Sequence, residues 1–279
     1  MLHRLRRAQV LPHAVLVVGV LISMFPFYWS IVLATNTSRD VFRYPPRLLP
    51  GSHLVENVHH VLDNIDFFGS MLNTLIVAIC TTALVLFFDS LAAFTFAKYD
   101  FPGRNVMFGL LMLIFMLPAQ LSIIPQYLIM VKIGWVGTLQ ALVVPAAVNA
   151  FGIFWMRQYI TRAFPDELLD AAKIDGAGFL RTYASVCLPM IRPGLAFLGI
   201  YTFIGSWNDY IWPLVVLNNP DKITLQVALA QLNLGAGGAL TDYAMLMAGT
   251  LMAVTPLLIV FTLFARGFVA DLAKGAVTG

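Results

Sequence analysis

The feature that most constrains this chain is a series of six apolar segments, each close to the roughly 20 residues that a helix needs to cross a bilayer. Hydrophobic residues make up 59% of the 279 residues and charged residues only 11%, which is typical of a polytopic membrane protein. We therefore expect an all-α membrane protein with six transmembrane helices. The segments are Val10–Ala34, Ser70–Phe96, Val106–Met130, Thr138–Met156, Pro193–Leu217 and Tyr243–Ala265.

The placement of Lys and Arg predicts how these segments are oriented, because cytoplasmic loops carry an excess of both. If the N-terminus lies inside, twelve of the 17 Lys and Arg residues fall on the inner side and five on the outer side. We therefore expect both termini and the charged segment at residues 165–189 to be cytoplasmic. The basic start MLHRLRRAQ could instead open a signal peptide cleaved near Ala34, but the apolar run is too long for a signal core.

The segment Pro165–Pro189, PDELLDAAKIDGAGFLRTYASVCLP, is a charged stretch between apolar runs. Proline suits the first position of a helix, and the acidic residues that follow it suit the first turn. We expect an amphipathic helix that ends at Gly176, a second short helix over Phe179–Val186, and a stop at Pro189. Because Ala171 and Ala172 are small, another backbone can approach this pair of helices, which we expect to dock a soluble partner.

Asp89 lies within the second apolar segment, nine residues or roughly 13 Å from Lys98 at its inner end. A carboxylate at the centre of a membrane helix costs about 2.5–3.5 kcal/mol, so Asp89 should face the bundle and have a partner. Two interpretations remain open. Asp89 either lines the pathway or makes a hydrogen bond that fixes helix packing.

Two prolines, Pro118 and Pro125, interrupt the third apolar segment. A discontinuous helix is tolerated where its backbone faces protein or a wet cavity, so Gln120 and Gln126 are candidates for contact with a polar solute. A simple kink that shapes the bundle is the alternative.

The fifth apolar segment contains GSWNDYIWP at residues 205–213. Sugars present a C–H face and a fringe of hydroxyl groups, so Trp207 could stack on the sugar ring while Asn208 and Asp209 bind its hydroxyls. The alternative is an aromatic belt at the membrane interface formed by Trp207, Tyr210 and Trp212.

Missing motifs argue against several classes of protein. No lysine follows a glycine, so no phosphate-binding loop is present and the chain itself should not bind ATP. No H-E-x-x-H or G-x-S-x-G motif occurs, and the three histidines at positions 53, 59 and 60 offer too few ligands for a metal site. The net charge of +3 is too small to suggest nucleic acid, and Cys80 and Cys187 are not expected to pair. We expect a protein that is not an enzyme and has no catalytic residues.

The charged segment also resembles a known motif. The series Asp170-Ala171-Ala172, Gly176, Val186 and Leu188-Pro189, with its spacing, resembles the EAA loop of permease subunits from ATP-binding-cassette importers. Asp170 stands where that family usually has Glu, and Val186 where it usually has Ile. The stretches LNTLIVA, LAAFTFAKYDFPGR, IPQY, FGIFWMRQYI, WNDYIWP and GAVTG extend the resemblance to the maltose-type carbohydrate permeases, with Thr278 where the tail commonly has Lys.

The resemblance implies a single membrane domain over residues 1–279, with a core at about 66–270, in the inner membrane of a bacterium or archaeon. It implies a second permease subunit, two ATPase subunits that hold ATP and Mg²⁺, and an external solute-binding protein that delivers a sugar of two or more units. No cofactor would bind to this chain. The residues that would dock on the ATPase are Glu167, Asp170, Ala171, Ala172, Asp175 and Gly176. The loop that would enter the binding protein comprises Leu232, Asn233, Leu234, Gly235, Ala236, Gly237 and Gly238.

An ion-coupled secondary transporter of a small polar solute is the main alternative. The sequence shows no clear internal repeat and no obvious relay of buried acids and bases, both of which are common in such proteins. A secondary transporter would work alone in an ion gradient, whereas an importer permease needs its partner subunits.

Overall fold

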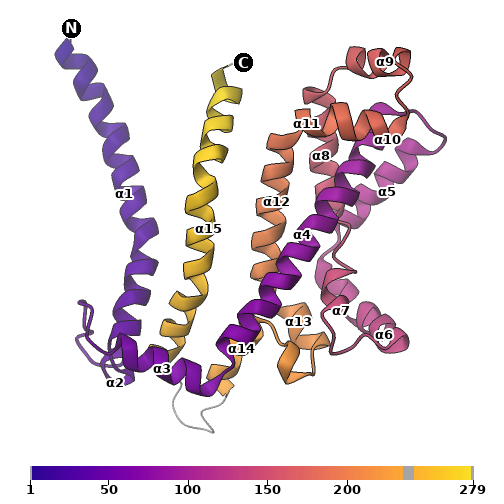
Figure 1. The fold of residues 1–279 in the computed structure, drawn as a ribbon. Helices are drawn as coiled ribbons and strands as arrows, with labels where there is room; N and C mark the ends of the chain where they lie inside the picture. Colours follow the sequence, from indigo (N-terminus) through magenta and orange to yellow (C-terminus); the bar gives the residue numbers. More distant parts are fainter. Residues whose placement is uncertain (1, 235–241, 278–279) are drawn as a thin grey trace. The chain divides into compact units, whose positions relative to one another are not determined.

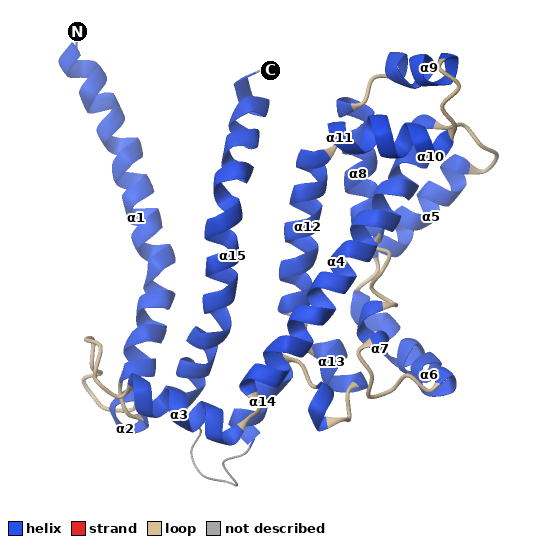
Figure 2. Cartoon of the chain, viewed as in Figure 1, coloured by secondary structure: helices blue, strands red, loops and turns tan. Residues whose placement is uncertain are grey.

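The computed structural model describes residues 2–234 and 242–277, and every regular element in these ranges is helical (Figures 1 and 2). The predicted all-α class is therefore confirmed for the described part of the chain. The α-helices are α1 (Leu2–Thr35), α2 (Ser38–Val41), α3 (Leu54–Asn64), α4 (Phe67–Lys98), α5 (Arg104–Met116), α6 (Ile123–Ile133), α7 (Gln140–Val143), α8 (Ala150–Ala163), α9 (Asp166–Ile174), α10 (Phe179–Thr182), α11 (Leu188–Met190), α12 (Arg192–Trp207), α13 (Ile211–Val216), α14 (Leu225–Leu234) and α15 (Tyr243–Val277). Short 3₁₀ turns at Ala119–Ser122 and Pro220–Lys222 and a π-helical turn at Tyr183–Cys187 join some of them.

The chain divides into two compact units. One comprises Met1–Phe67 and Ala228–Pro256, and the other comprises Phe68–Val227 and Leu257–Gly279. Most of the candidate functional residues belong to the second unit. The single membrane domain expected from the sequence stays a prediction.

In the first unit, two buried asparagines join the end of α1 to α3. The Nδ2 of Asn57 donates to the carbonyl oxygens of Ala34 and Asn36, at 2.8 and 2.9 Å. The Nδ2 of Asn36 donates in turn to the carbonyl oxygen of Leu49, at 3.1 Å. These bonds hold the segment after α1 against the last turns of that helix.

Two helical stretches are long and apolar enough to cross a membrane without interruption, Pro12–Thr35 within α1 and Phe67–Lys98. They match the first two predicted segments. The last predicted segment also begins where expected, at Tyr243, where the carboxylate of Asp242 accepts a hydrogen bond from the amide of Met245 at 3.0 Å. The third, fourth and fifth predicted segments are each interrupted. Six uninterrupted spans are therefore not found in the described residues.

The third segment bends by 97° between α5 and the helical stretch Ala119–Ile133. The break falls at Leu117 and Pro118, as the proline predicted. Pro125 does not break the chain, because it lies in the first turn of α6, where a missing N–H group costs no hydrogen bond.

The fourth and fifth segments were wrongly predicted as single helices. The helix α7 has only four residues, and α8 begins at Ala150 after a turn that contains Pro145. Asn149 starts α8 because its Oδ1 accepts a hydrogen bond from the amide of Phe151 at 2.9 Å. The helix α12 ends at Trp207, and the short α13 follows after residues 208–210.

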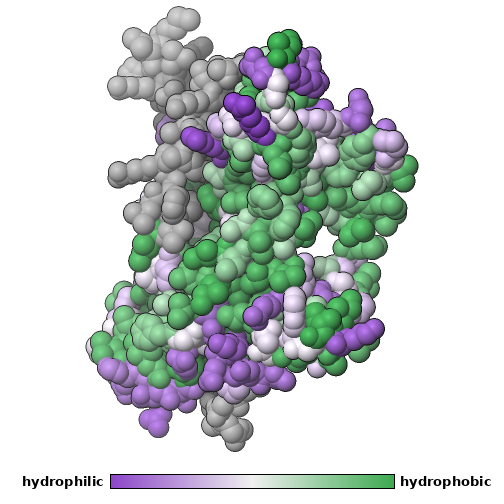
Figure 3. All heavy atoms as spheres, turned by 45° about the vertical axis from the view of Figure 1, so that its right-hand side comes forward, coloured by the Kyte–Doolittle hydropathy of each residue, from purple (hydrophilic) through white to green (hydrophobic). Residues whose placement is uncertain are grey.

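The surface view agrees with a membrane protein. Figure 3 shows hydrophobic side chains over most of the visible face, while hydrophilic ones gather around α9 at the top of the view and again along its lower edge. Exposed apolar side chains along α5, the 3₁₀ turn after it and α6 include Val106, Leu110, Ile114, Leu121, Ile124 and Leu128.

Candidate functional site

The helix α9 forms the first part of the charged segment, as predicted. Its first turn carries Asp166 and Glu167, and its last turn carries Lys173, so both ends suit the helix dipole. Gly176 adopts φ +71°, a left-handed conformation that glycine reaches without strain. Its amide donates to the carbonyl oxygen of Lys173 at 3.0 Å, which closes the helix end.

The helix α9 has one packed face and one outward face. Leu169 and Ala172 are buried. Asp170 and Ala171 are exposed, and the side chain of Ile174 is 86% exposed. The two alanines were predicted to share a shallow docking face, but Ala172 packs inward and only Ala171 faces outward. The exposed apolar side chain of Ile174 was not predicted as a docking residue, although its place at the end of an acidic helix was visible in the sequence.

The second part of the segment differs from the prediction. The helix α10 ends at Thr182, and a π-helical turn over Tyr183–Cys187 leads into α11. Pro189 was expected to stop the helix, but it lies inside α11, and the sharp bend comes at Ile191. In a π-helical turn each hydrogen bond spans five residues instead of four, which moves the carbonyl group that the ring of a following proline would otherwise meet. The helix can therefore continue past Pro189.

An aromatic cluster fixes both sides of α9 to the end of α4. At its centre Phe94 of α4 is completely buried. Its ring lies 5.9 Å from that of Phe164, which precedes α9, and 5.6 and 5.7 Å from those of Phe179 and Tyr183, which follow α9. Tyr99 completes the cluster at 5.5 Å. The aromatic cluster therefore ties the charged segment to a long membrane helix.

An ion pair strengthens the same connection. The Nζ of Lys98, at the end of α4, lies 2.6 Å from Oδ1 of Asp166 in the first turn of α9. The Lys98 side chain is only 4% exposed, and its Nζ lies 5.6 Å from the ring centre of Phe164. The hydrogen bond from Lys98 and its positive charge lower the pKa of the Asp166 carboxyl below its usual value. The sequence marked Lys98 only as an indicator of orientation.

Asp89, one and a half turns before Phe94 on α4, has the partner that its burial required. It is fully buried, and its Oδ1 accepts a hydrogen bond from the amide of Asn149 at 3.1 Å. Its Oδ2 has no hydrogen-bond partner among the described residues and lies against Gly152, where a Cβ atom would overlap it. Asp89 thus stabilises the N-terminus of α8, which is the contact that the packing interpretation requires.

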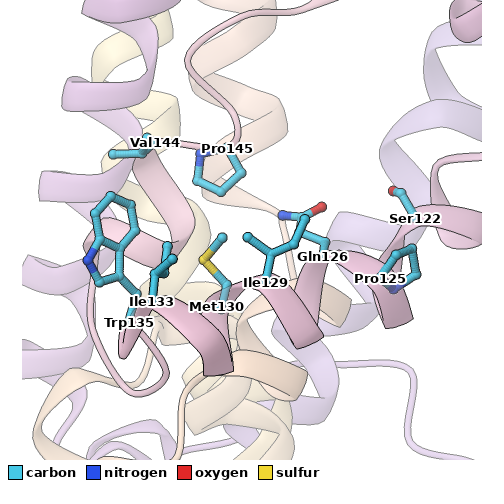
Figure 4. A pocket seen from close by; sticks show the side chains of 9 residues that line it. All are labelled: Ser122, Pro125, Gln126, Ile129, Met130, Ile133, Trp135, Val144 and Pro145. Carbon is cyan, nitrogen blue, oxygen red and sulfur yellow. The ribbon is translucent and has the colours of Figure 1, made fainter.

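An open cavity of about 560 Å³ lies between α6 and the turn that follows α7 (Figure 4). Gln126 lines it, but Gln120 does not. The lining is otherwise almost entirely apolar, and the cavity offers a solute more hydrophobic surface than hydrogen bonds. Its residues are Ser122, Pro125, Gln126, Ile129, Met130, Ile133, Trp135, Val144 and Pro145.

The three candidates for sugar contact do not lie together as expected. The side chain of Trp207 is 2% exposed, and its ring is stacked on Phe203 at 5.9 Å. The ring therefore packs inside the unit, which differs from the predicted stacking face. Asn208 and Asp209 are exposed in the break between α12 and α13.

The predicted loop around residue 232 begins as a helix. Leu232 is buried, and residues 232–234 belong to α14 rather than to a flexible loop. The helix was missed because the apolar pattern of LQVALAQLNL was read as part of an outer loop. Gly235, Ala236, Gly237 and Gly238 lie outside the described residues.

Comparisons with known proteins agree with this geometry. The family described as "Binding-protein-dependent transport system inner membrane component" matches residues 89–274. The arabinooligosaccharides transport system permease protein AraQ of Halalkalibacterium halodurans is 33% identical over 261 residues, which cover 92% of each chain. The sn-glycerol-3-phosphate transport system permease protein UgpE of Yersinia enterocolitica is 32% identical over 278 residues, 98% of each chain. A chain from the crystal structure of a bacterial ABC transporter involved in the import of alginate, an acidic polysaccharide, matches with a TM-score of 0.80 and 25% identity, over 94% of this chain and 97% of that one.

Proposed function

This chain belongs to the family of binding-protein-dependent transport system inner membrane components, and from that premise we propose that it forms half of the translocation pathway of a sugar importer. It is a permease subunit of an ATP-binding-cassette transporter. The full complex would contain a second permease, two ATPase subunits that bind ATP and Mg²⁺, and an external solute-binding protein. The ion-coupled alternative has no support from these relatives.

A polyhydroxylated solute is the class of substrate that the similar proteins share. Their names specify arabino-oligosaccharides, sn-glycerol-3-phosphate and alginate. We propose a sugar of two or more units for this chain. Asn208 and Asp209 would offer hydrogen bonds to its hydroxyl groups, with Trp207 holding their turn from behind. Gln126 would face the solute from the cavity. Contact of Gln120 with the solute, a place for Asp89 along the pathway in addition to its packing contact, and entry of residues 232–238 into the binding protein stay proposals.

The proposed topology has six membrane crossings in a bacterial or archaeal inner membrane, with both termini in the cytoplasm. The excess of Lys and Arg on the inner segments supports it. In this proposal the bent stretch from α5 to α6 counts as one crossing, and α1, α4, α8, α12 and α15 supply the other five. In this arrangement α9 faces the cytoplasm and Thr35, at the end of α1, lies at the outer face.

The attachment of α9 is the observation that carries the proposed mechanism. Phe94 and Lys98 fix both flanks of α9 to α4, while Asp170, Ala171 and Ile174 remain exposed for a partner. An ATPase subunit that held this outward face could displace α9, and α4 and α8 would move with it. ATP binding would then favour one of two arrangements of the permease over the other.

Substitutions in α9 test this function in the complete importer in liposomes, with uptake and ATP hydrolysis measured together. We expect Gly176→Leu and Asp170→Lys to leave insertion intact but to abolish uptake driven by hydrolysis. Gly178→Ala is the matched control, because Gly178 also has open space around it but has an ordinary φ of −71°. Normal uptake by Gly176→Leu and Asp170→Lys would contradict the docking role of α9.

A further inference from the structure

The segment at residues 44–50 folds back along α1 instead of leading away from it. The Oη of Tyr28 donates to the carbonyl oxygen of Leu48 at 2.5 Å, and the amide of Gly51 donates to Oγ1 of Thr35 at 3.0 Å. Gly51 permits this approach, because a Cβ atom there would overlap the carbonyl oxygen of Thr35. Tyr28 precedes the end of α1 by seven residues, so the segment returns about 10 Å along the helix.

Residues 42–50 carry four exposed apolar side chains together with the charged side chains of Arg43 and Arg47. The ring of Phe42 contacts that of Tyr243, with the ring centres 5.5 Å apart. The exposed fractions are 61% for Phe42, 96% for Tyr44, 63% for Leu48 and 75% for Leu49. They lie beside an apolar helix whose own side chains are also exposed, among them Phe25 and Phe27. A contiguous exposed apolar patch of this kind marks a contact surface, and its place beside a membrane span favours lipid.

Part of the backbone of residues 44–50 has no N–H group to satisfy or is bonded to side chains of the first unit. Positions 45, 46 and 50 are prolines, which have no N–H group to satisfy. The carbonyl oxygens of Leu48 and Leu49 accept hydrogen bonds from the side chains of Tyr28 and Asn36. The amides of Leu48 and Leu49 have no hydrogen-bond partner among the described residues, which places this backbone at the hydrated headgroup level rather than in the hydrocarbon.

The charges beside the segment fit the border of a bilayer. The Nε of Arg47 lies 3.1 Å from Oδ1 of Asp40, so that charge is balanced within the protein. Arg43 is exposed beside the aromatic side chains of Phe42 and Tyr44. Aromatic rings and arginine are the residues that anchor proteins at the level of lipid headgroups.

We propose that residues 42–50 form an interfacial anchor that binds outer-leaflet phospholipids. The leucines at positions 48 and 49 lie among the upper acyl chains, the two aromatic rings lie at the headgroup level, and Arg43 contacts phosphate. This proposal rests on the proposed topology, in which α1 crosses the membrane and Thr35 lies at its outer face.

Spin labels on the complete importer in phospholipid nanodiscs test the anchor. Cysteine replaces Leu48 or Leu49 in a background that carries Cys80→Ser and Cys187→Ser, and accessibility to oxygen and to a water-soluble nickel complex is measured. Val20 in the middle of α1 is the matched deep control, and the exposed polar His59 on α3 is the aqueous control. We expect the ratio of oxygen to nickel accessibility at positions 48 and 49 to be severalfold above that at position 59 and below that at position 20.

The outcomes separate the anchor from the topology on which it rests. If position 48 matches position 59 while position 20 is deep, the anchor is wrong and the topology stands. If position 20 is open to nickel, the topology and the anchor are both overturned. A photoreactive benzoylphenylalanine at position 48 should form adducts with lipid, and adducts with the second permease or the solute-binding protein instead would also overturn the anchor.

Discussion

The two ends of the unit formed by Phe68–Val227 are built in opposite ways. At the end that carries α9, large side chains such as Phe94, Phe164, Met156 and Ile191 are fully buried against one another. At the end that carries α6, α7 and α13, a smaller buried cluster includes Met130, Leu142 and Val216, and an open cavity of about 560 Å³ lies beside it between α6 and the turn after α7. The protein is closely packed without such a cavity where it would receive a displacement, and it has an open cavity where partners and a solute would complete it.

The helix α8 connects these two ends. Its C-terminal side leads to Phe164 in the aromatic cluster, and its N-terminal side is held by Asp89 through the amide of Asn149. Val144 and Pro145, which precede this N-terminus, line the cavity. A displacement of α9 would therefore reach the cavity wall through α4 and α8 moving as one body.

Among the substitutions that test the difference between the two ends, Phe94→Ala should have the largest effect. Removing a buried phenylalanine typically costs about 3–5 kcal/mol, and here it would also separate α4 from both flanks of α9. We expect a lower unfolding temperature of the purified importer and ATP hydrolysis that no longer drives uptake. Phe87→Ala on the same helix is the matched control, because the Phe87 side chain is 53% exposed. If the two variants had the same unfolding temperature and the same coupling of hydrolysis to uptake, the aromatic cluster would not be what joins α4 to the flanks of α9.

Gly152→Ala should have the next largest effect, at the junction between α4 and α8. The new methyl group would overlap Oδ2 of Asp89, and overpacking of this kind costs about 1–3 kcal/mol. We expect reduced assembly of the complex, measured by copurification of its subunits. Gly109→Ala, at a helical glycine with open space around it, should assemble normally.

A second substitution, Asp89→Ser, tests whether the overlap with Asp89 causes the assembly defect of Gly152→Ala. Because serine is shorter than aspartate, Asp89→Ser should partly restore assembly in the Gly152→Ala background. If Asp89→Ser alone assembles normally and the double variant assembles no better than Gly152→Ala alone, the overlap with Asp89 is not the cause of the defect.

How much of this arrangement the sequence could predict depends on how far apart the interacting residues lie along the chain. Gly176 and Pro118 act on the backbone near them, so the end of α9 and the break after α5 were predicted. Pro145 and Asn149 carried the same kind of local signal for the break before α8, and it was overlooked. The aromatic cluster joins Phe94 to Phe179 across 85 residues, and no local rule specifies which aromatic rings meet at such a separation.

The ion pair between Lys98 and Asp166 should have a smaller and asymmetric effect. Asp166→Asn leaves a nearly buried ammonium group without its partner, whereas Lys98→Met removes that charge and keeps the side-chain length. Because the Asp166 side chain is 79% exposed and solvent screens it, the pair itself should contribute little to stability. We expect coupling of hydrolysis to uptake to fall further in Asp166→Asn than in Lys98→Met. The reverse order would contradict the role of burial in this pair.

The same pair gives a pH prediction. The pKa of Asp166 is lowered by its hydrogen bond with Lys98, so the stabilisation is present above the usual carboxyl pKa and is lost only as pH falls through the lowered value. Coupling in wild type should therefore show no loss from this group between about pH 5 and pH 8. A loss that appears in this range in wild type and is absent in Lys98→Met would contradict the assignment.

The smallest expected effect is on the reactivity of Cys187, which reports whether the packed end opens. Burial raises the pKa of its thiol to about 12, so at pH 8 almost none of it is the thiolate that reacts with maleimides. In a Cys80→Ser importer we expect no labelling of Cys187 in the presence or absence of ATP, and full labelling after denaturation in detergent. The same background with Phe94→Ala should label at a measurable rate. Labelling of Cys187 during ATP turnover with Phe94 intact would mean that the packed end itself opens, and the contrast between a closed receiving end and a pathway end with an open cavity would be lost.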